Sequence, residues 1–88
     1  MALDIWDALW SVLYSRNYRL VIYVYRLNAE GKPQRPYLLK TAPDPVLLDL
    51  LQRQHGGGEF RILVRAGRRM ILSGEIAVEP INSSRVRV

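Results

Sequence analysis

The side chains of this chain best suited to chemistry are its arginines. Eleven of the 13 basic residues are arginine, and the formal net charge is +5 at pH 7. Guanidinium groups form planar bidentate pairs with phosphate and stack on aromatic rings. Residues 1–15 carry two acids and no base, whereas residues 16–88 carry all 13 bases and six acids. The charge therefore predicts either a polyanionic partner or a basic surface that has no specific partner.

Tyrosines and arginines occupy several odd-numbered positions of two predicted strands, residues 18–27 and 59–65. Alternate residues of a strand point to the same face, and the odd-numbered positions of both strands carry these side chains. If the two faces coincide, rings and guanidinium groups lie together, as in sheets that stack single-stranded bases. The sequence thus predicts a sequence-nonspecific nucleic-acid interface made of Arg19, Tyr23, Tyr25, Arg61, Arg65, Arg68 and Arg69. The alternative is that the first helix covers this face and the tyrosines belong to the core.

Residue types that support catalysis are few. The chain has no cysteine, which excludes thiolate nucleophiles, disulfides and Cys-ligated zinc. His55 is the only histidine, and we expect it in the last turn of a helix with its ring half-packed on the core. Asp4 and Asp7 share a helix face, but two carboxylates are too few for a metal site.

One enzymatic pattern is present in a loose form. Pro43-Asp44 followed by Glu59-Phe60-Arg61 resembles the Pro-Asp…Glu-x-Lys pattern of a large nuclease superfamily. Arginine stands where that chemistry places a lysine near the attacking water, and it does not give up a proton readily. Asp44 is also well explained as a helix N-cap. We therefore expect no enzyme activity, no metal and no cofactor.

The N-terminal segment predicts a Trp-rich amphipathic helix over residues 3–15, within a unit of residues 1–16. Its acids and serines fall on one narrow face, and the apolar stripe opposite them is wider than one packing surface needs. The helix either lies across its own sheet or packs partly against a second copy. The second reading predicts a homo-oligomer whose contacts are Trp6, Leu9, Trp10 and Leu13. The acidic polar face argues against a membrane-surface role.

The remaining pattern predicts two hairpins joined through a helix. Residues 18–27 read as a central strand covered on both faces, followed by a turn at 28–33 and a strand at 37–41. Asp44 and Pro45 open a helix that Gly56–Gly58 end. A three-residue loop at 66–68 then joins strands 59–65 and 70–78, and it keeps their even-numbered residues on one face.

These elements define an α+β fold: one domain over residues 1–81, in α-β-β-α-β-β order, with two helices and a mostly antiparallel sheet of about four strands. Residues 82–88 form a short basic tail. The acidic start and the lack of a long apolar run argue against a targeting or spanning segment, which favours a cytoplasmic location. The predicted function is a small basic non-enzymatic nucleic-acid-binding module, and we expect it to act as a homodimer. The alternative is a protein–protein interaction or assembly module that self-associates through its N-terminal helix.

Overall fold

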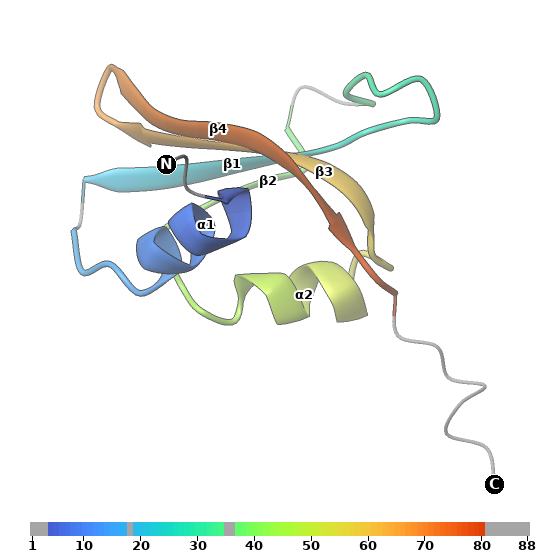
Figure 1. Ribbon diagram of the computed structural model, residues 1–88, viewed down its shortest axis with the longest axis horizontal. Helices are drawn as coiled ribbons and strands as arrows, with labels where there is room; N and C mark the ends of the chain where they lie inside the picture. Colours follow the sequence, from blue (N-terminus) through green and yellow to red (C-terminus); the bar gives the residue numbers. More distant parts are fainter. Residues whose placement is uncertain (1–3, 18, 35–36, 81–88) are drawn as a thin grey trace, which may run out of the picture.

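Two helices and four strands follow one another in the predicted order. The computed structural model describes residues 4–17, 19–34 and 37–80. The predicted basic tail at 82–88 lies outside these residues, as do Tyr18 and Pro36 at the expected strand starts. The elements are α1 (Ile5–Leu13), β1 (Leu20–Arg26), β2 (Leu39–Thr41), α2 (Leu47–Arg53), β3 (Gly58–Ala66) and β4 (Arg69–Val78) (Figure 1).

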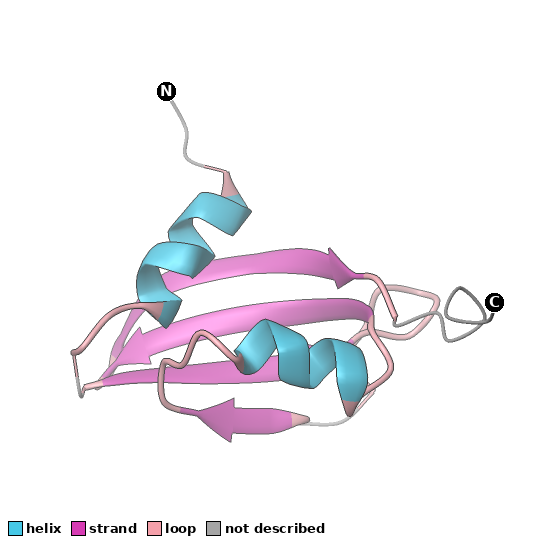
Figure 2. Cartoon of the chain, turned by 90° about the horizontal axis from the view of Figure 1, so that it is seen from below, coloured by secondary structure: helices cyan, strands magenta, loops and turns pink. Residues whose placement is uncertain are grey.

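The four strands form one antiparallel sheet in the order β2-β1-β3-β4. The strand with the strongest sequence signal, β1, is central as predicted, between β2 and β3. The prediction that both of its faces are covered is wrong, because α1 and α2 both lie on the same side of the sheet (Figures 1 and 2). The sheet therefore has one face under the helices, the covered face, and one open face.

The core lies between the covered face and the two helices. Even-numbered residues of the central strands supply the sheet side of this core, and each helix adds two fully buried leucines, Leu9 and Leu13 from α1 and Leu47 and Leu51 from α2. The buried strand positions are aliphatic or Phe. The odd-numbered positions include Tyr23, Tyr25, Arg61 and Arg65 beside Val21, Glu59 and Leu63. Burial of the apolar set under the helices leaves the polar tips of the odd set in water.

The β3–β4 hairpin keeps the predicted pairing by a different route. Its turn has two residues, Gly67 and Arg68, instead of three, and Gly67 has a φ of 63°. Glycine at the first central position is typical of a type II′ turn. With a two-residue turn alone, Val64 would pair with Ile71. An even-numbered residue of β3 would then share a face of the sheet with an odd-numbered residue of β4. A bulge next to Arg65 leaves Ile71 unpaired, so that Val64 pairs with Leu72 and the even-numbered residues share the covered face.

The second helix begins later than its capping signal suggests. α2 starts at Leu47, because Pro45 and Val46 form a turn that the Asp44 carboxylate stabilises by accepting the Val46 N–H. The glycines after the helix act as predicted: Gly56 and Gly57 have positive φ, and the Gly57 N–H donates to the Leu51 carbonyl. Neither helix among the described residues is long and apolar enough to cross a membrane.

Candidate nucleic-acid interface

Three tyrosines meet on the open face of the sheet. Tyr23 and Tyr25 are odd-numbered residues of β1, so both point away from the helices. The Tyr37 ring lies over them, with ring centroids 5.6 Å from Tyr23 and 5.9 Å from Tyr25. We call these three residues the tyrosine cluster. The Lys40 ammonium group lies 5.6 Å from the centre of the Tyr23 ring, so a cation borders the aromatic surface.

The two predicted strand faces do coincide. In the β1–β3 register, Tyr25 lies opposite Arg61, Tyr23 opposite Leu63 and Val21 opposite Arg65. The first helix does not cover this face, because its buried leucines pack on the other side of the sheet (Figure 2). The tyrosines are half-buried or exposed on a face that no described element covers, so the alternative in which they belong to the core is wrong.

A small pocket of about 70 Å³ lies beside the tyrosine cluster, with Leu63, Arg65 and Met70 completing its wall. The walls combine aromatic faces, aliphatic side chains and one guanidinium group. The Arg65 Nη2 donates to the Arg68 carbonyl over 3.4 Å. Its Nε is buried and has no hydrogen-bond partner among the described residues. Such unsatisfied buried donors are uncommon in folded proteins.

Arginines from three segments gather at one end of the sheet. Leu20 pairs with Ala66 and Ala66 with Arg69, so the start of β1 lies beside the β3–β4 turn. This places together Arg19, Arg65, Arg68 and Arg69, which we call the arginine end. The loop before β1 is ordered by two short contacts: Ser15 Oγ accepts the Asn17 N–H, and Asn17 Oδ1 accepts the Arg19 N–H.

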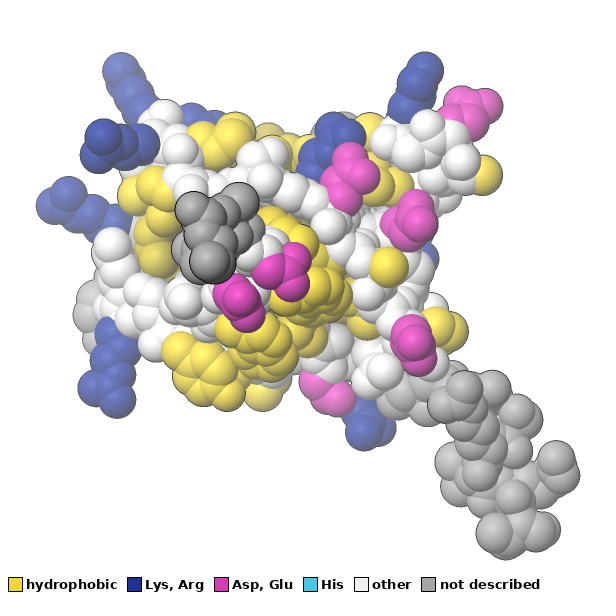
Figure 3. Space-filling model, in the orientation of Figure 1, with side chains coloured by type: hydrophobic (Ala, Val, Ile, Leu, Met, Phe, Trp, Pro, Cys, Tyr) yellow, Lys and Arg dark blue, Asp and Glu magenta, His cyan; other side chains and the backbone are white. Residues whose placement is uncertain are grey.

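Among the described residues, acidic side chains lie away from the end of the sheet that holds the β3–β4 turn. Figure 3 shows Lys and Arg side chains projecting from that end, whereas acidic and further basic side chains lie toward the middle and the opposite end. Glu59 lies at the start of β3 and Glu79 follows the end of β4, both at the far end of the sheet, and Glu75 pairs with Arg61 at 2.9 Å. The predicted contribution of Arg61 is therefore partly neutralised by its neighbour, whereas the arginine end faces no described acid at its own end.

The residues predicted for self-association separate into two groups. Leu9 and Leu13 are fully buried in the core of the chain itself, so they offer no surface to a second copy. Trp6 is half-buried and packs against the core. Trp10 is 40% exposed and stacks at 5.9 Å on Tyr14, which is 67% exposed. The apolar surface left on α1 is thus centred on Trp10 and Tyr14, and the sequence analysis did not select Tyr14.

His55 lies beyond the end of α2, not in its last turn as predicted. Its carbonyl accepts a hydrogen bond from Arg26, whose second guanidinium nitrogen donates to the Gly57 carbonyl over 3.0 Å. The Arg26 guanidinium also lies 5.1 Å from the centre of the Phe60 ring. Arg26 therefore holds the segment after α2 against the sheet. The contact that His55 makes through its carbonyl is structural.

Besides Tyr14, two further residues were not selected from the sequence. Arg26 shares its parity with the buried residues of β1, and a cation at a core position of a strand is the signal that could have indicated it. Tyr37 precedes β2 and is followed by a bend at Leu38, which takes it out of the strand alternation. Strict alternation from Leu39, which pairs with Val24, would have placed Tyr37 on the covered face.

The acids of the nuclease-like pattern do not form a site. Asp44 precedes α2 and caps a turn, while Glu59 lies in β3 after α2, so the helix separates the two carboxylates. Among the described residues, no three His, Asp or Glu side chains are grouped to hold a metal ion. A hollow of about 200 Å³ at the β3–β4 edge is lined by Glu59, Glu75, Ile76 and Ala77, which include two acids and no histidine.

Comparisons with known proteins give no matching family model, no matching curated protein and no matching solved structure. Function is therefore inferred from the chemistry of the surface itself.

Proposed function

We propose that this protein is a small non-enzymatic nucleic-acid-binding module that contacts phosphates with its arginine end. The observation that carries the proposal is the convergence of Arg19, Arg65, Arg68 and Arg69, which come from three segments of the chain, at one end of the sheet. Arg19, Arg68 and Arg69 are exposed, so their guanidinium groups are free to meet a partner.

The chemistry of this end suits a polyanion. Guanidinium groups bind phosphate oxygens in a bidentate manner and stay charged at any physiological pH. Separation from the acids raises the local positive potential and favours approach of an anionic polymer. Contacts to phosphates fix the position of a nucleic acid without reading its sequence. We therefore expect broad sequence tolerance and binding that weakens steeply with salt.

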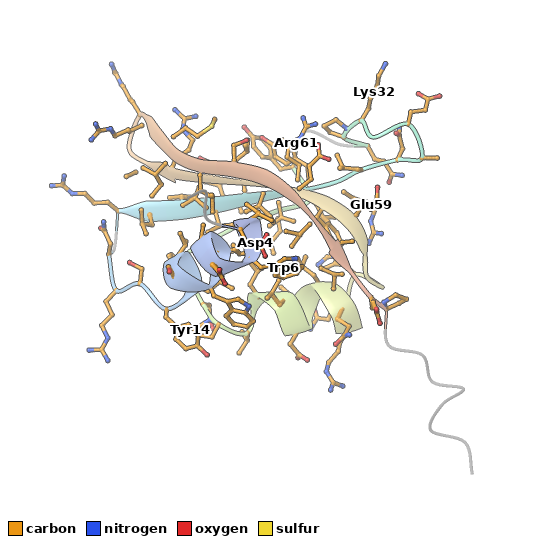
Figure 4. All side chains as sticks on the ribbon, viewed as in Figure 1. Asp4, Trp6, Tyr14, Lys32, Glu59 and Arg61 are labelled. Carbon is orange, nitrogen blue, oxygen red and sulfur yellow. The ribbon has the colours of Figure 1, made fainter. Side chains whose placement is uncertain are left out.

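The test compares two double variants that remove the same charge. Arg68→Ala with Arg69→Ala removes two cations from the arginine end, while Lys32→Ala with Arg53→Ala removes two exposed cations elsewhere. Lys32 lies in the turn at the opposite end of the sheet, as Figure 4 shows, and Arg53 pairs with Asp49 on α2. Binding of fluorescent oligonucleotides is measured across a salt series for both variants and the wild type.

The arginine-end variant should bind every sequence more weakly, and its log–log salt slope should fall by about 1.4, the value for two lost single-strand phosphate contacts. The control variant should keep the wild-type slope. Equal losses of oligonucleotide affinity in both variants would mean that binding depends on the net charge of the protein and not on the arginine end. No retardation of single- or double-stranded oligonucleotides by micromolar wild-type protein at low salt would overturn the proposal.

A second candidate function is self-assembly through α1. The observation that favours it is the exposed, stacked pair of Trp10 and Tyr14 on the outer surface of the helix layer. Aromatic side chains of this kind are enriched at protein interfaces. Molecular mass in solution at about 100 μM tests it, since common dimer affinities lie far below this concentration. A monomeric wild type excludes this candidate, and a dimer that Trp10→Gln converts to a folded monomer supports it.

A further inference from the structure

We infer that the nucleic acid bound by this protein is single-stranded, with one base held against the tyrosine cluster while its backbone continues to the arginine end. This inference rests on the proposed function and adds the class of nucleic acid and the contact that selects it. Tyr37 is the central residue of this contact, because its ring touches both other tyrosines and is 58% exposed.

The tyrosine cluster presents aromatic faces in more than one orientation. The Tyr37 ring is tilted by 39° to Tyr23 and by 79° to Tyr25, so the three rings do not form a flat stack. A pocket of about 70 Å³ lies among them and is also lined by Leu63 and Met70. A planar ring that enters from solvent can stack on one tyrosine while its edge meets the others. A nucleobase has this shape, and every base has a face that can stack.

Arg65 joins the aromatic surface to the basic one. It lines the tyrosine pocket and also bonds to the Arg68 carbonyl in the β3–β4 turn, so one side chain belongs to both regions. Its buried Nε has no partner among the described residues, and bases and phosphates both carry hydrogen-bond acceptors. Met70, which pairs with Arg65 in the register, is 53% exposed and has a flexible side chain that can move aside. A strand running from the pocket past Arg65 would reach Arg68 in the β3–β4 turn.

A double helix does not fit this surface in the same way. Bases in a duplex are stacked inside and present only their edges in the grooves. Stacking on a protein ring requires an unpaired base that can be turned outward. A duplex would therefore engage the arginine end alone and would leave the tyrosine cluster unused.

The experiment measures fluorescence anisotropy of three labelled probes of equal length: a dT12 single strand, a 12-base-pair duplex and an abasic strand with the same phosphates but no bases. The variants are Tyr37→Leu, Tyr37→Phe and the control Val46→Ala, which changes an exposed apolar residue in the turn before α2. Circular dichroism and thermal melting verify folding. Tyr23→Leu is a second variant within the tyrosine cluster.

We expect Tyr37→Leu to weaken dT12 binding by about 5- to 100-fold, the loss typical of one base–aromatic stack. Tyr37→Phe keeps the ring and should retain most of the affinity. Binding to the duplex and to the abasic strand should change less than twofold in Tyr37→Leu, and Val46→Ala should match the wild type on all three probes.

Failure of this inference is distinguishable from failure of the proposed function. If the wild type binds dT12, the duplex and the abasic strand equally, and neither tyrosine-cluster variant changes dT12 binding, the arginine end acts alone and the single-strand inference is overturned. If the wild type binds none of the three probes at low salt, the proposed function itself falls.

Discussion

The two faces of the β-sheet are built from the same strands, but they differ in burial and in the types of side chain that they carry. On the covered face, Ile22, Val24, Phe60, Ile62 and Val64 are all 0% exposed. On the open face, the residues between them in sequence are half-buried, and they carry aromatic rings, guanidinium groups and a single leucine. Alternation along a strand thus separates the residues that hold the fold from those that can meet a partner.

Two arginines show the same contrast for a single residue type. Arg26, on the covered side, donates to two backbone carbonyls and packs over a Phe ring. Arg61, on the open face, makes an exposed ion pair with Glu75. Hydrogen bonds that replace water around a part-buried charge contribute more than an ion pair in solvent. The position of a charged residue in the sheet, more than its type, therefore decides whether it stabilises the fold.

The largest effect expected from this contrast is on stability. Phe60→Ala removes a fully buried ring from the covered face and should lower the free energy of unfolding by about 3–5 kcal/mol. Leu63→Ala, on the same strand but on the open face, should cost no more than about 1 kcal/mol. Urea denaturation followed by circular dichroism measures both. Equal losses in the two variants would mean that the open face is packed as tightly as the covered one.

The next effect concerns the backbone at the edge of the covered side. A Cβ at Gly57 would lie 2.6 Å from Pro80 N and Val78 O, whereas a Cβ at Gly56 has no atom within 4 Å. Both glycines have positive φ, so both alanine variants carry similar backbone strain of about 1–2 kcal/mol. Gly57→Ala should lose about 1 kcal/mol more, because it also pushes the end of β4 outward. Thermal melting of the two variants compares them, and identical midpoints would contradict the close approach.

The two arginines give a smaller and more direct comparison. Arg26→Ala should cost about 2 kcal/mol, because it leaves the carbonyls of His55 and Gly57 without their charged donor. Arg61→Ala should cost about 0.5 kcal/mol or less, as exposed ion pairs contribute little. Chemical denaturation at two salt concentrations separates them, since screening acts mainly on the exposed pair. A larger loss of stability from Arg61→Ala than from Arg26→Ala would contradict the conclusion that Arg26, and not Arg61, stabilises the fold.

The smallest effect is predicted at His55. The contact that this residue makes to Arg26 uses its backbone carbonyl, which His55→Gln leaves in place. The change in stability should be about 1 kcal/mol or less, and oligonucleotide binding should be unaffected. Denaturation and anisotropy measurements on the same preparation test both statements. Lost binding with retained folding would place a functional site on the covered side, where none is proposed.

Much of the candidate site could be predicted because strand parity is a local property. The alternation of β1 and β3 places Tyr23, Tyr25, Arg61 and Arg65 at odd positions, and the observed register brings these positions together. The bulge beside Arg65 could not be predicted from the local sequence, because Ala66-Gly67-Arg68 is compatible with a two-residue turn and with a three-residue turn. The correct pairing follows from burial of the apolar even-numbered residues, which fixes the register whatever the turn.

The sequence by itself determined the element types, their order and which residues of each central strand share a face, because these depend on neighbours along the chain. Tertiary structure alone decided that both helices lie on one face, which leaves the tyrosines open and buries Leu9 and Leu13. It also decided that a bend carries Tyr37 onto Tyr23 and that Arg26 reaches the end of α2. These outcomes depend on how segments that are distant in the sequence pack against the same limited apolar surface. The sequence pattern of a single segment does not show which of them will pack there.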